Sequence, residues 1–476
     1  MYLFFCLSEK RHAALLITFI SLLLPHPTLA ATDPDPTPAP VTHLSLPEAM
    51  AIAYRSNPQI LREQAILRQT DESMPEALSG WRPTVTGSAT ANYNESNYVT
   101  FPYGGSFRYN QKFRAPGYAA GVTVSEPIFR GGKTWASMRK ARSSILGERA
   151  HLVEIEQQLF INVVSAYVAV TQARALLALT LENEHTLKGQ VELTTRQLAL
   201  NQATRTDALQ AESQYEAAQA STRQAEGQVR VAEATFQRVI GIVAPEKLSP
   251  AERLPSPFVS EAQINQLAIN DLPQVMQAQY QLESAKHDVK LAIAELLPEV
   301  SAQASYQRQV NQGNGKFSEN ATAVMLQASL PLYQGGSEYA HIRAAKQAVN
   351  AALHNLAEQR REARENALSA WQKLAADSDQ LARNQKAVAT GVEALHAIQQ
   401  QELLGVRTTF EVLQQQELLF DQQKTLVQNT ANLIQDSYQL AAATGHLTAK
   451  ELKLHVTLYD PHTHYHQVKW KLIGME

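Results

Sequence analysis

Near the end of the chain three histidines alternate, a spacing that could place imidazole nitrogens around a metal ion. They are His462, His464 and His466. No cysteine or carboxylate cluster accompanies them, so we expect a mobile tail rather than a closed metal site. The sequence also lacks a nucleophile elbow, a phosphate-binding loop and the HExxH motif of zinc enzymes. We therefore expect neither catalysis nor a cofactor.

The composition favours long helices over a large globular core. The 476 residues carry a formal net charge of −3, and only 7% are aromatic. This nearly balanced charge gives no indication of nucleic-acid binding. The longest stretches lack Gly and Pro and are rich in Ala, Gln and Glu, which suits helices that pack through small side chains.

The first 30 residues have the pattern of a secretory signal peptide. Lys10 and Arg11 precede a short apolar run at 13–24, and a small-residue cleavage pattern ends at Ala30. A membrane anchor is the alternative, but this run of about 12 residues is shorter than the roughly 20 that span a bilayer. The only cysteine, Cys6, lies in this leader. A mature chain without a thiol suits an oxidising periplasm.

Two tandem copies of one pattern follow the leader. Pro127 aligns with Pro331, and each proline precedes a Gly-Gly pair by four residues. The same offset of 204 residues aligns Gly241 with Gly445, so the chain contains an internal repeat. We predict a signal peptide over 1–30, a first structural repeat over 31–241, a Pro-rich linker over 242–260, a second repeat over 261–445 and a C-terminal tail over 446–476.

Each copy is expected to contain a leading helix, two strands, a long helix and a returning helix. Stretches without Gly or Pro predict the helices, and period-two alternation between the Pro and Gly-Gly markers predicts the strands. The expected helices span 46–79, 133–199 and 204–240 in the first copy and 261–297, 337–403 and 408–444 in the second. The expected strands span 82–93 and 118–129, then 298–309 and 322–333.

The helix lengths predict how the helices pack. Each long helix would measure roughly 100 Å, and each returning helix about half of that. A returning and a leading helix together match one long helix. We therefore expect them stacked end to end beside it, with Pro83 and Gly241 at opposite ends of the stack. The run 159–179 is very apolar, but its polar side chains favour a buried packing face over a membrane helix.

The predicted strands have the length of membrane strands, which need about 9–11 residues when tilted. Four strands cannot close a barrel, and unpaired backbone groups cannot face lipid. Several chains would then share one barrel, and three chains would supply 12 strands. A soluble coiled-coil scaffold with β-hairpin caps is the alternative, but it does not explain a secretory leader combined with lipid-compatible strands.

In order and twice over, these markers resemble the TolC family across essentially the whole mature chain. The resemblance implies a mainly α fold with a small β part. It implies a trimer whose 12-stranded outer-membrane β-barrel takes four strands from each chain and continues into a long periplasmic α-helical barrel. The motifs that carry it are Leu46-Pro47-Glu48-Ala49, Asn57-Pro58, the two Pro-x-x-x-Gly-Gly signals, Thr204 to Glu212, Gly405 to Leu413, and Leu458-Tyr459-Asp460-Pro461, the last being similar to the type I secretion branch.

The resemblance also implies the function and the partners. The protein would be a passive export duct in the outer membrane of a Gram-negative bacterium, extending into the periplasm. It would be a homotrimer embedded in outer-membrane lipid that works with a periplasmic adaptor (a membrane fusion protein) and an inner-membrane ABC or proton-driven pump, without nucleic acid. We expect type I protein secretion, with multidrug or metal efflux as the alternative. A non-pore envelope scaffold is the competing class.

The same resemblance assigns the gate to the turns between long and returning helices, at the periplasmic tip. By motif position, Arg407 matches the gating arginine, and Thr206 and Asp207 match its partner on a neighbouring chain. A guanidinium suits this role because its fork can bind a carboxylate bidentately. Breaking these links would open the duct.

Two further roles follow from motif position. Glu411 matches an acidic ring that faces the pore and favours cations. Gln414 stands where the family has a second acidic ring, so one carboxylate ring is missing and the implied cation selectivity is in doubt. Glu402 stands where the prototype has an aromatic gating residue. The expected adaptor contacts are Leu198, Leu200, Asn201, Gln202, Leu403, Leu404, Gly405 and Val406.

Overall fold

The computed structural model describes residues 43–100, 109–255, 263–264, 272–311 and 317–474. The signal peptide expected over 1–30 lies outside these residues and stays a prediction. Two helices of 67 residues dominate the described chain, α5 (Lys133–Ala199) and α9 (Ser337–Leu403). Their starts are 204 residues apart, as the repeat predicts, and both predicted spans are confirmed.

The Gly-Gly pairs determine where the two long helices begin. Gly131 and Gly132 have φ values of 56° and 79°, and Gly335 and Gly336 have values of 70° and 83°. This left-handed region costs glycine little because it has no Cβ. Each pair therefore lets the chain leave the end of the sheet and enter a long helix.

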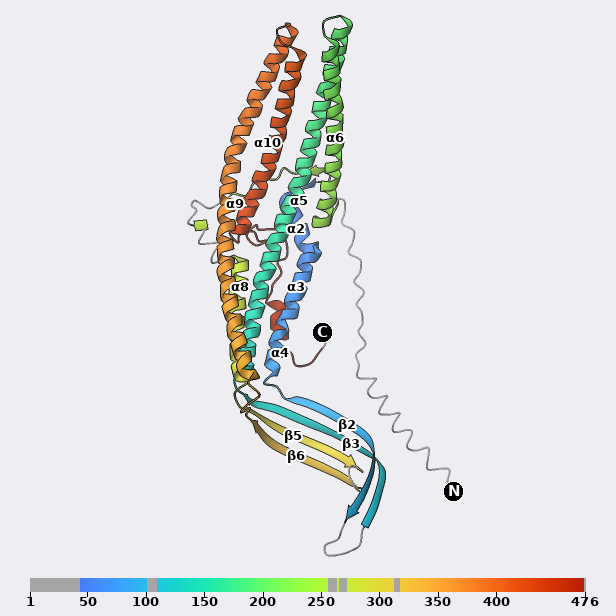
Figure 1. Ribbon diagram of the computed structural model, residues 1–476, viewed down its shortest axis with the longest axis vertical. Helices are drawn as coiled ribbons and strands as arrows, with labels where there is room; N and C mark the ends of the chain where they lie inside the picture. Colours follow the sequence, from blue (N-terminus) through green and yellow to red (C-terminus); the bar gives the residue numbers. More distant parts are fainter. Residues whose placement is uncertain (1–42, 101–108, 256–262, 265–271, 312–316, 475–476) are drawn as a thin grey trace, which may run out of the picture. The chain divides into compact units, whose positions relative to one another are not determined.

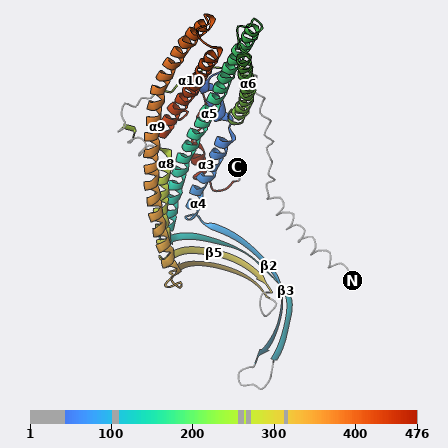
Figure 2. The same cartoon turned by 45° about the horizontal axis from the view of Figure 1, so that its top comes forward.

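Each long helix is accompanied by shorter helices placed end to end (Figures 1 and 2). The returning helices α6 (Arg205–Ile240) and α10 (Thr409–Ala443) pack on α5 and α9 respectively. Beyond α6, α5 contacts α2 (Leu46–Ser56), α3 (Pro58–Asp71) and α4 (Ser73–Ser79). Beyond α10, α9 contacts α8 (Pro273–Ala294). The expected stacking beside each long helix is confirmed.

The single leading helix expected over 46–79 is wrong, because the chain breaks at Asn57 and again at Glu72. Pro58 excludes the helical conformation from the residue before it, and Asn57 has φ −71° and ψ 123°. The Asn57 amide donates to Val239 O at 2.8 Å, which joins the end of α6 to the start of α3.

The position expected for Gly241 is also wrong. A Cβ built on Gly241 would lie 3.4 Å from Ser56 Oγ, so this glycine lies where α6 meets α2 rather than at an end of the stack. In the second copy α8 ends at Ala294 instead of 297, and most of the expected start of that helix lies outside the described residues.

Four antiparallel strands form one sheet in the order β2 (Thr84–Thr100), β3 (Tyr109–Arg130), β5 (Glu299–Val310), β6 (Ser318–Ser329). Strands β3 and β5 join the two copies, with Val124 opposite Ala304. The register shifts between Pro127 and Phe129, because proline has no N–H to donate to the ladder. The four strands expected between the Pro and Gly-Gly markers are all present in this sheet, but β2 and β3 are longer than predicted and β6 begins and ends four residues earlier.

The largest core cluster surrounds the middle of α5. Phe160 and Tyr167 are fully buried there, and the Tyr167 hydroxyl lies 2.9 Å from Leu44 O and 2.7 Å from Ser249 O. Part of α5 is long and apolar enough to cross a membrane by composition, but residues of the run 159–179 form this core. The expectation of a buried packing face is confirmed.

The segment between the copies is more ordered than predicted. Strand β4 (Lys247–Leu248) pairs in parallel with β1 (His43–Leu44). The two carbonyls beside the Tyr167 hydroxyl belong to Leu44, in β1, and to Ser249, the residue that follows β4. The linker therefore packs over the middle of α5 before the chain enters the second copy.

Residues 448–468 are docked on the helices, so the mobile tail expected over 446–476 is wrong in this part. The Ala449 N–H donates to Glu156 Oε1 at 2.6 Å, and Leu447 is fully buried in the α5 core. The tail contains the short helix α11 (Thr463–Val468), which packs on α3. Asp460 begins α11 by accepting hydrogen bonds from His462 N and Thr463 Oγ1, both at 2.9 Å.

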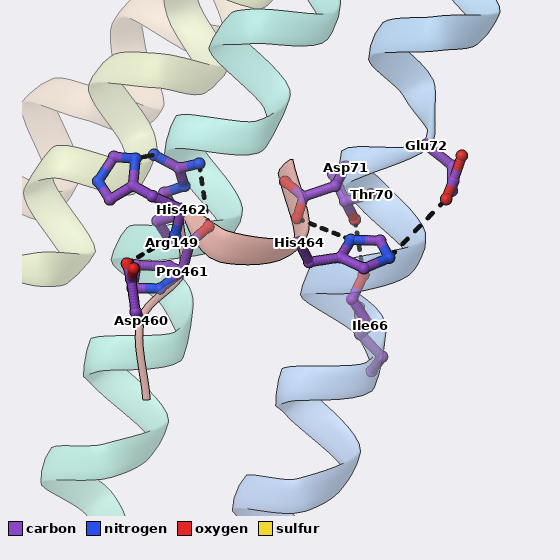
Figure 3. A network of polar contacts seen from close by, with 9 residues as sticks. All are labelled: Ile66, Thr70, Asp71, Glu72, Arg149, Asp460, Pro461, His462 and His464. Carbon is purple, nitrogen blue, oxygen red and sulfur yellow. Dashed lines mark hydrogen bonds and ion pairs between the residues drawn. The ribbon is translucent and has the colours of Figure 1, made fainter. Parts of the chain in front are cut away.

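Two of the three histidines, His462 and His464, contact different helices (Figure 3). His464 Nδ1 lies 3.2 Å from Oδ2 of the fully buried Asp71, whereas His462 Nδ1 lies 3.1 Å from Arg149 Nη1. Arg149 also donates to Pro461 O at 3.1 Å. Within the described residues no group of three or more metal-ligating side chains comes together. The imidazoles of His462 and His464 instead help to attach the tail.

A buried acidic pair between α3 and α5 makes stability depend on pH. Burial raises the pKa of Glu148 to about 7. A hydrogen bond with the buried Glu63 and the negative charge of Glu63 raise this pKa further. The folded chain therefore keeps a proton that the unfolded chain, with an ordinary pKa of 4.5, has lost. Stability conferred by this proton is present below about pH 4.5 and is lost as pH rises through about 7.

We expect Glu148→Gln to reduce this pH dependence. At pH 5 the variant should unfold near the wild-type temperature, and at pH 8 it should unfold several degrees above it, because a second carboxylate no longer has to ionise beside Glu63. Thermal unfolding of the purified protein at both pH values measures this. Glu182→Gln, at an exposed position of α5, is the control. Identical shifts between the two pH values in wild type and Glu148→Gln would contradict the prediction.

Candidate functional site

Both turns that connect a long helix to its returning helix have the same backbone geometry. The Gly405 N–H donates to Glu402 O at 2.8 Å, and the Val406 N–H donates to Gln401 O at 2.9 Å. These two bonds form a Schellman helix ending, which requires a left-handed residue. Gly405 has φ 74°, and Asn201 takes its place in the first copy with φ 59°. The two tips are therefore built alike, although their side chains differ.

The first tip contains a capping box at the start of α6. Thr204 N and Thr204 Oγ1 donate to Asp207 Oδ2 at 2.9 and 2.6 Å, and Asp207 N donates back to Thr204 Oγ1 at 3.2 Å. This arrangement satisfies N–H groups that a helix start leaves unpaired. In the described part of the chain, Asp207 Oδ1 and the exposed Thr206 side chain have no hydrogen-bond partner.

The second tip uses its acidic residue differently. Glu411 Oε2 accepts from Thr408 N at 2.9 Å, while Glu411 Oε1 accepts from Arg407 Nη1 at 2.5 Å. The hydrogen bond from the Thr408 backbone, then that from Arg407, lowers the pKa of Glu411, so the carboxylate is ionised and paired. Arg407 Nε also donates to Gln401 Oε1 at 3.2 Å. Its Nη2 group has no partner among the described residues.

Glu402 connects the two tips, a role that the sequence did not indicate. Its Oε1 accepts from Thr409 Oγ1 at 2.9 Å, across the turn, and from Gln190 Nε2 at 3.3 Å, on the other long helix. Gln190 is 212 residues away in the sequence, so local pattern could not reveal the pair. Glu402 is therefore an internal link of the tip, not simply a surface glutamate.

The first turns of α10 separate a packed face from an exposed face. Val412 and Leu413 are buried, and Leu413 belongs to a small core shared with α5 and α6. Gln414 and Leu418 are exposed on the other side, in helical register with the half-exposed Glu411. The two predicted pore-constriction residues thus share one face of the helix. Because Arg407 already neutralises Glu411 within the chain, a ring of free carboxylates is not expected there.

The predicted adaptor contacts are mostly exposed apolar side chains at the two turns. Apart from the half-buried Leu198, the long apolar residues among them do not pack within the described chain. The exposed fractions are 67% for Leu200, 77% for Leu403, 78% for Leu404 and 70% for Val406. Large apolar side chains left exposed at both turns are typical of an interaction site.

The sequence matches the family model described as outer membrane efflux protein over residues 51–242 and 264–446. It is 31% identical to the outer membrane efflux protein BepC of Brucella suis over 432 residues, which covers 90% of this chain and 92% of BepC. It is 20% identical to the alkaline protease secretion protein AprF of Pseudomonas aeruginosa over 346 residues, covering 71% of each chain. The fold resembles that of the outer membrane protein VceC of Vibrio cholerae, with a TM-score of 0.72 at 18% identity, covering 84% and 96% of the two chains.

Proposed function

Because this chain belongs to the outer membrane efflux protein family, we propose that it is a passive duct that conducts secreted proteins from an inner-membrane pump and its adaptor to the exterior. The chain is located in the outer membrane and extends into the periplasm. The four-stranded sheet is the membrane part, and the hairpins α5–α6 and α9–α10 form the periplasmic part. Cargo passes without chemical change, so no catalytic residue is required.

The observation that carries this proposal is the sheet, which ends in two open edges, β2 and β6. Open edges cannot face lipid because their backbone groups would lack partners. β6 also presents Val324 and Leu326 with exposed fractions of 82% and 69%. A homotrimer would pair β2 of one chain with β6 of the next and close a barrel of 12 strands, with these apolar side chains towards lipid.

The gate is proposed at the two tips. Arg407 has unused guanidinium donors, and Asp207 has an unused carboxylate oxygen. In the trimer they would pair between neighbouring chains, with Thr206 beside them. Glu411 and Gln414 would face the pore below this link. Docking of the adaptor on the exposed tip leucines would strain these contacts and open the duct.

Two observations favour protein secretion as the cargo class. AprF is named for secretion of an alkaline protease, and the Tyr459-Asp460-Pro461 motif, which resembles the type I branch, attaches the tail to α2 and α5 here. BepC is named as an efflux protein, so efflux of small toxic compounds is the second candidate. A deletion strain separates them: protein secretion predicts loss of a secreted polypeptide with unchanged resistance, and efflux predicts the reverse.

Replacing both tip leucines by serine, Leu403→Ser and Leu404→Ser, should abolish export while the trimer still assembles. Each leucine that is buried on docking would contribute about 1.5–3 kcal/mol. Losing one leucine would therefore lower the affinity for the adaptor at least about tenfold. Export by the complemented deletion strain and trimer content of its outer membrane measure this. Val243→Ser, at a position 71% exposed beyond the end of α6, is the control. Wild-type export by the double variant would exclude these leucines from docking.

A further inference from the structure

The last described residues form a short segment that neither the duct nor its gate uses. Residues 469–473 read Lys-Trp-Lys-Leu-Ile. Trp470, Leu472 and Ile473 have exposed fractions of 65%, 74% and 93%. An aromatic and two aliphatic side chains would not be left in water without reason in so short a stretch, and two lysines alternate with them.

This segment is held at one place in the fold. Arg82 Nη1 donates to Lys471 O at 3.0 Å, and β2 begins only two residues after Arg82. Just before the segment, Val468 is buried. The Tyr465 ring packs against the core cluster that contains Met74. It also makes a cation–π contact with Arg149, whose guanidinium carbon lies 5.5 Å from the ring centroid. The segment therefore lies where the helices end and the strands begin.

Other residues at the same junction have matching chemistry. Trp81, one residue before Arg82, and Trp135, in the first turn of α5, meet edge to face with ring centroids 4.8 Å apart. They remain 39% and 59% exposed. Tryptophan is enriched at the interface between the hydrocarbon core and water, where its ring suits both environments.

The charges at the junction are mainly positive. Arg82, Lys471 and Lys133 have no carboxylate partner among the described residues. Arg130 is paired with Glu299 at 3.6 Å, and Glu76 also lies there. Lysine and arginine beside tryptophan and aliphatic residues form the composition that binds a phospholipid surface, because the cations meet phosphate groups while the apolar side chains enter the acyl boundary.

We propose that residues 469–473, together with Trp81, Arg82 and Trp135, form a lipid-binding site that rests on the periplasmic leaflet of the outer membrane. The site would hold the docked tail against the membrane surface and fix the level at which the sheet enters the bilayer. This inference depends on the proposed membrane location of the sheet. A contact with a neighbouring chain is the alternative that the test must separate.

The full protein can be probed with single cysteines, because its only cysteine, Cys6, lies in the predicted leader. Ile473→Cys reports on the site, Val324→Cys reports on the membrane face of the sheet, and Leu404→Cys reports on the distant tip. Each is labelled with a polarity-sensitive fluorophore. The proteins are reconstituted into vesicles of phosphatidylethanolamine and phosphatidylglycerol, with or without lipids that carry nitroxides at shallow and deep acyl positions.

We expect nitroxide lipids to quench the Ile473→Cys label at least about half as strongly as the Val324→Cys label, mainly from shallow positions. The Leu404→Cys label should not be quenched. Adding Trp470→Ser and Leu472→Ser to Ile473→Cys should remove most of its quenching, because the remaining lysines cannot enter the acyl boundary. Trimer content and conductance should stay unchanged in this variant.

Quenching of Val324→Cys without quenching of Ile473→Cys would overturn the lipid site and leave the duct intact. Absence of quenching at both positions would overturn the duct and the lipid site together. Crosslinking of Ile473→Cys to a neighbouring chain, without lipid quenching, would assign the segment to contacts between copies and would also overturn the proposal.

Discussion

Replacing Arg407 by serine is expected to raise the single-channel conductance of the reconstituted protein severalfold. Arg407 lies at the turn of the second tip, with its side chain 48% exposed and paired to Glu411 in the same chain. An exposed pair at this i, i+4 spacing contributes little to stability. Its loss would not unfold the tip, so a large rise in conductance would come from lost links between chains. Planar bilayer recordings measure this directly.

Three further variants identify the partner of Arg407. Asp207→Asn should raise conductance like Arg407→Ser if the guanidinium binds the neighbouring Asp207, and its amide oxygen can still accept the capping bonds from Thr204. Glu411→Gln should have a smaller effect, since it breaks only the link within the chain. Arg205→Ser removes a tip cation that has no ion-pair partner in the described chain and is the control.

Combining Arg407→Ser with Asp207→Asn should raise conductance no further than either change alone, because two residues of one link are not independent. Additive effects of the two changes would show that they act at different places. Unchanged conductance in Arg407→Ser would exclude this arginine from the gate.

Truncation after His446 should nearly abolish assembly of the trimer. The cut removes Leu447, Ala449 and Leu454, which are buried in the core around α5. Burial of one leucine contributes about 1.5–3 kcal/mol, a large part of the roughly 5–15 kcal/mol that keeps a typical protein folded. It also leaves Glu156, whose pKa burial raises to about 6, without the N–H of Ala449.

The amount of heat-resistant trimer in the outer membrane measures this effect. Truncation after Val468 is the matched control, because it keeps the buried tail residues and α11 and removes only the exposed segment. We expect this shorter truncation to assemble at nearly the wild-type level. Equal assembly of both truncated chains would show that the tail covers the helices without stabilising them.

Much of the architecture could be predicted from local pattern. The Gly-Gly pairs and the stretches without Gly or Pro predicted the ends of α5, α6, α9 and α10 within a residue, since a helix end depends on the few residues that pair with its last turn. The resemblance to the TolC family is confirmed by the family match and by the fold. The matched lengths of long and short helices correctly predicted their side-by-side packing.

One error has a local cause and another arises where distant parts of the chain meet. The leading helix breaks at Asn57 because Pro58 excludes the helical conformation from the residue before it. The tail has only a weak pattern of its own, which predicts mobility. His464 is held by Asp71, 393 residues away, and no local rule relates the two.

The contacts of the two tips also fall into a local class and a class that depends on tertiary structure. Turn chemistry in the sequence determines the Schellman endings and both capping boxes, because those bonds join residues within six positions of each other. The Arg407–Glu411 pair is local as well, because the two residues are four positions apart. Tertiary structure decides that Glu402 reaches Gln190 and that the 469–473 segment lies beside Arg82. These contacts depend on how two hairpins, a sheet and a tail pack together. These contacts are stabilised by burial and pairing between segments that are far apart in the sequence. No local pattern in the sequence therefore indicates them.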